Sequence, residues 1–141
     1  MALFNLKQTD VITRLRGNAA EDAALAHLLA AGLTLVERNY RTPGRGGGEI
    51  DLVMREVGGT LVFVEVRARA GTTHGGAAAS VGGVKQRRIV LAARHYLMRH
   101  RSPPACRFDV VAIDGNHIEW LKAAFDAARS DRRGAGDART P

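Results

Sequence analysis

The chain has 141 residues, of which 45% are hydrophobic and 25% charged, a length and composition typical of an ordinary soluble globular protein of one domain. Its formal net charge of +7 favours polyanionic partners such as nucleic acid, although such a charge can also serve solubility alone. The single cysteine, Cys106, excludes an internal disulfide and indicates a reducing compartment.

The chain shows neither a secretory signal nor a membrane span. Residues 1–17 are polar and lack the apolar region of a signal peptide. The longest apolar stretch, residues 23–36, is interrupted by polar residues and is too short to cross a bilayer. We therefore expect a cytoplasmic protein that does not associate with membranes.

A helix, a strand and a loop are predicted first. Asn18-Ala19-Ala20-Glu21 has the pattern of a capping box at the start of a helix, and Gly32 suits the position just after its end. Alternating residues over 33–40 predict a strand. Residues 41–48 form a basic, glycine-rich loop that leads into the next strand.

Two short alternating segments follow, and they are the most informative part of the chain. Residues 48–54 and 61–67 predict the strands of a hairpin that turns at residues 56–60. Pairing Leu52 with Val64 gathers the apolar side chains of both strands on one face. A slip of one residue would send one apolar set to the wrong face, so the pattern predicts the register.

The same register brings charged residues together on the other face. Asp51 is expected opposite Glu65, and Glu49 opposite Arg67. Like charges that face each other across a ladder destabilise a sheet, so the carboxylates need a compensating charge. A divalent metal ion is the predicted source of that charge.

The second half of the chain predicts a helix and two strands. Residues 84–100 have helical periodicity, and Pro103 and the next proline stop the helix. Strands are predicted over 107–113 and 117–121, joined by a turn at residues 114–116. The order of helix, three strands, helix and two strands indicates an α/β domain with a mixed sheet and helices packed on it.

We divide the chain into three parts. Residues 1–16 are an N-terminal extension, and residues 17–128 form a single domain. Residues 129–141 have almost no apolar side chains, which is typical of a disordered tail.

Several motifs in this order resemble those of the YraN-like family of small bacterial proteins. They are Glu21, Arg38-Asn39-Tyr40-Arg41, Gly48-Glu49-Ile50-Asp51, Phe63-Val64-Glu65-Val66-Arg67, Lys85 and Arg107-Phe108-Asp109-Val110-Val111. The family is similar to archaeal Holliday-junction resolvases and to the restriction-endonuclease-like nuclease superfamily. The resemblance implies a restriction-endonuclease-like, or resolvase-like, α/β fold with a mixed central sheet flanked by helices.

The resemblance also implies a metal site. Asp51 and Glu65 match the two acids of the superfamily motif, and the backbone carbonyl of Val66 would point at the ion. Their hard oxygen donors suit Mg²⁺, or Mn²⁺ in its place. Glu21 matches an acid that such sites take from the first helix. The plainer alternatives are a solvated end of the hairpin for the pair and the capping box for Glu21.

Arg67 departs from the superfamily pattern, which has lysine at this position. Arginine can clamp a phosphate but stays protonated, so it cannot easily act as a base. Glu49 has two interpretations, an additional ligand or a simple ion pair with Arg67. Both Arg67 and Glu49 are assigned to the catalytic site, together with Asp51, Glu65 and Glu21.

Basic residues in two places are candidates for nucleic-acid binding. Lys85, Arg87 and Arg88 stand at the start of the second helix, where cations and the helix N-terminus can bind phosphate together. Arg41 and Arg45 belong to the glycine-rich loop. The alternatives are a solvated helix face and a plain connection.

These features predict a metal-dependent nuclease that acts on DNA, including branched or damaged DNA. The alternative is a non-catalytic nucleic-acid-binding module that retains the nuclease fold. A third hypothesis is that the chain is an interaction protein whose acidic patch binds a basic partner. Resolvase-like enzymes act as dimers, so the resemblance also suggests a homodimer, although the sequence shows no dimer face.

Overall fold

The structure is a computed structural model that describes residues 17–44, 46–69 and 81–127. The predicted N-terminal extension, the predicted C-terminal tail and Arg45 lie outside the described residues.

Within the described residues, two helices and five strands form an α/β domain. A helix over residues 17–30 precedes β1 (Thr34–Arg41), β2 (Glu49–Arg55), β3 (Leu61–Arg69), α2 (Gly83–Leu97), β4 (Cys106–Asp114) and β5 (His117–Phe125). The strands form one mixed sheet in the order β1-β2-β3-β4-β5, in which β3 and β4 are parallel and the other neighbours antiparallel. The predicted elements and their order are confirmed.

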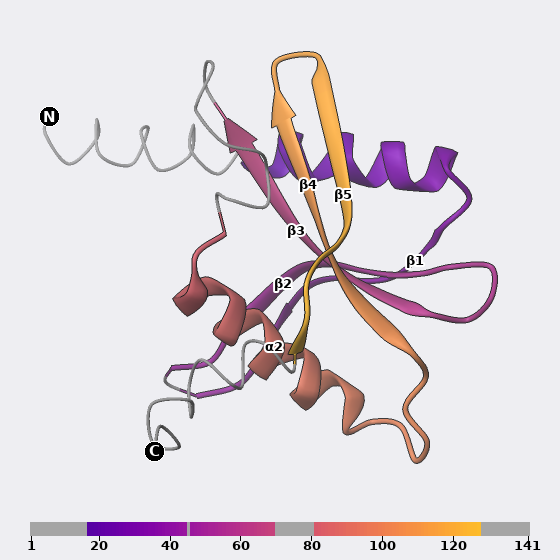
Figure 1. Ribbon diagram of the computed structural model, residues 1–141, viewed down its shortest axis with the longest axis vertical. Coiled ribbons are helices and arrows are strands. Elements are labelled where there is room, and N and C mark those ends of the chain that lie inside the picture. The colour runs from indigo at the N-terminus through magenta and orange to yellow at the C-terminus, as the bar shows by residue number, and fades with distance from the viewer. Residues whose placement is uncertain (1–16, 45, 70–80, 128–141) are drawn as a thin grey trace, which may run out of the picture.

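The two helices cover opposite faces of the sheet (Figure 1). On one face, α2 packs Ile89 and Tyr96 into a core that contains Phe63 and Phe108. On the other face, the 17–30 helix packs Ala24 and its neighbours against a second core. The central strands are therefore buried on both faces. Among these residues, no helix is long and apolar enough to cross a bilayer.

The end of the first helix is as predicted, but its start is not. Gly32 has a φ of +100°, and the Leu33 N–H donates to the Leu28 carbonyl at 3.1 Å, which is the glycine-ended arrangement expected there. Asn18 lies inside the helix, whereas a capping residue has non-helical backbone. The capping-box interpretation of Glu21 is therefore wrong.

The predicted hairpin and its register are confirmed near the turn. Leu52 pairs with Val64, and the Glu56 N–H donates to the Thr60 carbonyl at 2.9 Å. The prediction of a single apolar face is wrong at Ile50, which lies in the α2-side core while Leu52 lies in the other. Ile50 and Leu52 are both at even positions, so the alternation breaks between them, at Asp51, where the pairing with β3 ends. Because β2 is covered on both faces, Ile50 is still buried, in the core that also holds Val53.

The last strand is longer than predicted. β5 continues to Phe125 because the β4–β5 ladder shifts register between Phe108 and Val110 and then resumes. Ala123 takes a φ of +50° within this irregular stretch. The extension carries Phe125 into the core, where its ring stacks on that of Phe108 with centroids 5.1 Å apart.

Candidate metal centre

The candidate site begins where β2 and β3 separate. Their ladder runs from the turn to the Leu52–Val64 pair and goes no further. At the next position the Asp51 side chain takes the place of backbone pairing, because its Oδ2 accepts a hydrogen bond from the Val66 N–H at 2.8 Å. Asp51 is 8% exposed, so a carboxylate is fixed inside the gap between the strands.

Glu65 lies beside Asp51 and is also buried, with 6% of its surface exposed. The two are not ladder partners as predicted, since the strands have already separated, but they lie close enough for Asp51 to raise the pKa of Glu65. On the α2 side, the Lys85 Nζ lies 3.5 Å from the Glu65 Oε2. Side chains from β2, β3 and α2 therefore meet at one point.

The electrostatics of this pair are unusual for a carboxylate. Burial, followed by the charge and hydrogen bond of Asp51, raises the pKa of Glu65 from 4.5 to about 8, although Lys85 and Arg67 oppose the shift. Burial and a neighbouring carboxylate both disfavour the ionised form of Glu65. A bound cation would favour that form instead.

Glu21 reaches the same region from the 17–30 helix. The Arg38 Nε lies 3.3 Å from its Oε1, and the Asn39 side chain also hydrogen-bonds to it. Burial and then the charge of Asp51 raise the pKa of Glu21. Asn39 has a φ of +56° within β1, a conformation that asparagine tolerates better than most residues. Glu21 is therefore close enough to Asp51 for the two charges to interact.

Glu49 and Arg67 are arranged differently from the predicted hairpin pair. The Glu49 Oε2 lies 3.1 Å from the Arg41 Nε, so its ion pair joins β2 to β1. The β2–β3 ladder ends before it would bring Glu49 opposite Arg67, and that predicted pairing is wrong. Arg67 lies beside Ala112 of β4, and its charge acts on Glu65 by lowering the pKa.

The other predicted nucleic-acid contacts are spread apart. Lys85 is brought to the acidic pair, whereas Arg87 and Arg88 are exposed on the outside of α2. Arg41 is exposed at the end of β1 and is paired with Glu49. Of these basic residues, Lys85 is the one paired with Glu65 in the part of the chain that the structure describes.

The side chains alone provide too few donors for a hard divalent cation, so backbone, water or phosphate oxygens would have to complete its coordination. In the described residues, no three His, Cys, Asp or Glu side chains are arranged to hold a metal ion. Asp51 and Glu65 provide two buried carboxylates, and Mg²⁺ commonly uses one or two carboxylates together with water and phosphate oxygens. This chemistry suits Mg²⁺ or Mn²⁺, with the Val66 carbonyl as the further donor that we expect.

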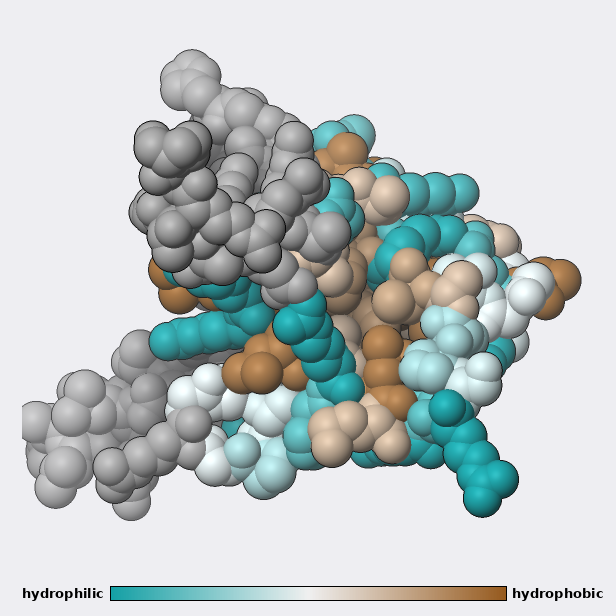
Figure 2. Space-filling model, turned by 60° about the horizontal axis from the view of Figure 1, so that its bottom comes forward, coloured by the Kyte–Doolittle hydropathy of each residue, from teal (hydrophilic) through white to brown (hydrophobic). Residues whose placement is uncertain are grey.

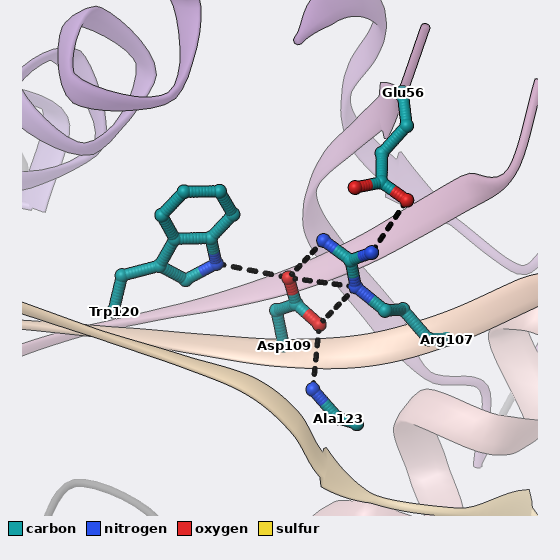
Figure 3. Close-up of polar contacts among 5 residues, drawn as sticks. All are labelled: Glu56, Arg107, Asp109, Trp120 and Ala123. Atoms are coloured by element: carbon teal, nitrogen blue, oxygen red, sulfur yellow. Dashed lines mark hydrogen bonds and ion pairs between the residues drawn. The ribbon is translucent and has the colours of Figure 1, made fainter. Parts of the chain in front are cut away.

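Asp109 is an important residue to which the sequence analysis assigned no role. It is fully buried, and its carboxylate accepts hydrogen bonds from the Arg107 guanidinium at 3.0–3.2 Å, from the Trp120 Nε1 at 2.9 Å and from the Ala123 N–H at 2.9 Å (Figure 3). Glu56 pairs with the same guanidinium. The detectable signal was an aspartate in the middle of an apolar strand.

The Asp109 cluster is separate from the candidate metal centre. Asp109 lies beside Val64 in the β3–β4 ladder and shares Trp120 with the face covered by the 17–30 helix, whereas Glu65 contacts α2. Both of its carboxylate oxygens accept hydrogen bonds. The bond from the Ala123 N–H holds the irregular part of β5. Its role is structural.

A mixed sheet between two helices, with a buried acidic pair where two strands separate, defines an α/β protein consistent with a resolvase-like fold. Residues 20–113 match the model of Uncharacterised protein family UPF0102, and the chain belongs to this family, also known as the YraN family.

Close relatives carry the same family name. The chain is 67% identical over 116 residues to the UPF0102 protein of Acidovorax sp. (strain JS42), covering 82% of this chain and 88% of that one. It is 69% identical over 121 residues to the UPF0102 protein of Methylibium petroleiphilum, covering 84% and 99%. The similarity thus spans nearly the whole of these relatives.

Proposed function

We propose that this protein is a metal-dependent nuclease that hydrolyses phosphodiester bonds in DNA, with branched or damaged DNA as its substrate. The observation that carries the proposal is that two carboxylates, Asp51 and Glu65, are buried beside each other, with the Lys85 Nζ 3.5 Å from the Glu65 Oε2. Strongly shifted pKa values that arise from burial and a specific partner are typical of functional sites. A buried like-charged pair has no evident value for stability alone.

In this proposal Asp51 and Glu65 hold Mg²⁺ or Mn²⁺, and Glu21 supports them from the first helix. The Val66 N–H fixes the Asp51 carboxylate, so one donor is oriented before any ion arrives. Glu65 would bind such an ion in its ionised form, so binding would release a proton from any protonated Glu65. The bound ion would polarise the phosphate and lower the pKa of a water molecule.

Two cations flank the pair and can contact the substrate phosphate. Arg67 can clamp phosphate oxygens but does not transfer protons, because guanidinium stays charged. Lys85 is 42% exposed and lies 3.5 Å from Glu65, so an amine is present at the site although β3 carries arginine. We assign phosphate binding to both residues. We also propose that Lys85 takes the place of the lysine that the superfamily carries at the position of Arg67.

Metal affinity should depend steeply on pH. Only the ionised Glu65 carboxylate binds a cation, and its pKa lies at about 8. The affinity for Mn²⁺ should therefore rise by up to about tenfold per pH unit from pH 6 to pH 8 and level off above, because metal displaces one proton. Isothermal titration calorimetry in buffers of different ionisation enthalpy measures both the affinity and the proton released.

Two variants complete that titration. Glu65→Gln mimics the protonated side chain, so it should fold normally and lose both the binding and the proton release. Glu119→Gln changes an exposed acid on β5 and should behave as wild type. Binding by Glu65→Gln at wild-type affinity, or binding that does not vary with pH, would contradict a metal centre at this pair.

Arginine at position 67, where the superfamily has lysine, favours a second candidate function. This alternative is a non-catalytic nucleic-acid-binding module with the same fold. This alternative predicts DNA binding that needs no divalent metal. The logarithm of its affinity would fall linearly with the logarithm of salt concentration, because binding releases counterions. Metal-independent binding without cleavage would favour it.

A further inference from the structure

The outer side of α2 carries a row of exposed hydrophobic side chains. Val84, Leu91 and Met98 are 59%, 50% and 78% exposed. Each follows the previous one by seven residues, so on a helix with 3.6 residues per turn they lie nearly in line. The buried side of α2, which includes Ile89, Ala93 and Tyr96, faces the opposite way. The row is therefore not part of the core.

Positive charges lie on both sides of this row. At about 100° per residue, Arg87 and Arg94 fall on one flank and Arg88 on the other. All three are exposed, and α2 contains no acidic residue from Gly83 to Leu97. Figure 2 shows that hydrophobic and strongly hydrophilic side chains adjoin one another on the described surface seen in that view.

We propose that this face of α2 binds an acidic amphipathic helix of a partner protein. A hydrophobic row with a seven-residue repeat fits the apolar seam of a second helix. Cations on both flanks would face acidic side chains beside that seam, where complementary charges set partner choice and register. The proposal assigns the partner's chemistry and does not depend on nuclease activity.

The same pattern disfavours two other occupants of this face, a second copy of the chain and a DNA duplex. A second copy would place one arginine-flanked row against another, and such like charges repel. A DNA duplex would meet the arginines but would leave exposed Leu91 and Met98 against a charged phosphate backbone. Arg87 and Arg88 were predicted to bind nucleic acid, so the two assignments make different predictions.

A synthetic peptide tests the proposal directly. The probe is a fluorescent helix of about 21 residues with Leu at the seam positions and Glu on both flanks. A peptide of the same composition in scrambled order is its control. Fluorescence anisotropy should show binding to the full chain by the designed peptide and roughly tenfold weaker binding by the scrambled one.

Variants separate the hydrophobic and the charged contributions. The double variant Leu91→Gln/Met98→Gln should weaken peptide binding by roughly tenfold or more, and so should Arg87→Glu/Arg88→Glu. Val57 is 95% exposed in the β2–β3 turn, so Val57→Gln is a matched control that should bind as wild type. Circular dichroism melts check that each variant folds.

Three results would overturn the proposal. One is no preference for the designed over the scrambled peptide. Another is loss of duplex-DNA binding in Arg87→Glu/Arg88→Glu, with peptide binding unaffected by Leu91→Gln/Met98→Gln, because the face would then be a nucleic-acid surface. The third is a dimer in light scattering that Leu91→Gln/Met98→Gln dissociates, because a second copy would then occupy it.

Discussion

Replacing Gly48 by alanine should lower the free energy of unfolding by about 3 kcal/mol or more, the upper end of the range for overpacked sites. A Cβ at this position would lie 1.9 Å from the Arg88 carbonyl oxygen and 2.6 Å from its carbon. These are backbone atoms of α2, so no side-chain rotation can make room. The helix would have to move away from the start of β2.

The effect should also reach the candidate metal centre, because β2 carries Asp51 and α2 carries Lys85. Urea unfolding followed by circular dichroism measures the stability. Gly58→Ala is the matched control, because nothing lies within 4 Å of the added methyl group there. It should change the stability by no more than about 0.5 kcal/mol. Equal stability of the two variants would show that α2 does not contact Gly48 as described.

Replacing Asp109 by alanine should cost about 3–5 kcal/mol of stability, as for one partner of a buried ion pair. The change would leave the Trp120 Nε1–H and the Ala123 N–H without their acceptor, and Arg107 with Glu56 alone from this cluster. Buried donors that lose their partners account for much of this cost. The bulged end of β5 should loosen first, because the Ala123 bond holds it.

Thermal or urea unfolding measures this effect, and hydrogen exchange at Ala123 reports on the end of β5. Asp114→Ala, at the partly exposed end of the same strand, is the control and should stay within about 0.5 kcal/mol of wild type. The structural role assigned to Asp109 would be contradicted by wild-type stability in Asp109→Ala.

The elements and the hairpin register could be predicted because they depend on local pattern. Alternation in the two strands and the glycine turn between them were sufficient to pair Leu52 with Val64, as observed. The end of that ladder could not be predicted, since it depends on the Asp51 side chain replacing a backbone partner. A strand pattern contains no information on where pairing stops.

The properties of the site depend on contacts between distant segments. The pKa of Glu65 is raised mainly because the residue is buried, and the sequence does not show that burial. The partner of Glu49 is Arg41 because β1 lies on the other side of β2, a choice that the hairpin alone cannot reveal. Asp109 was visible as a polar residue in an apolar strand, but its donors come from β4 and β5 together.

The most direct test of the account is cleavage of labelled single-stranded, duplex and four-way-junction DNA with Mg²⁺ or Mn²⁺. Asp51→Asn is assayed in parallel, because asparagine can still accept the Val66 hydrogen bond while removing the charge. We expect metal-dependent cutting by the wild type that is lost in Asp51→Asn. Cutting by both proteins at the same rate, or DNA binding by both without any cutting, would contradict it.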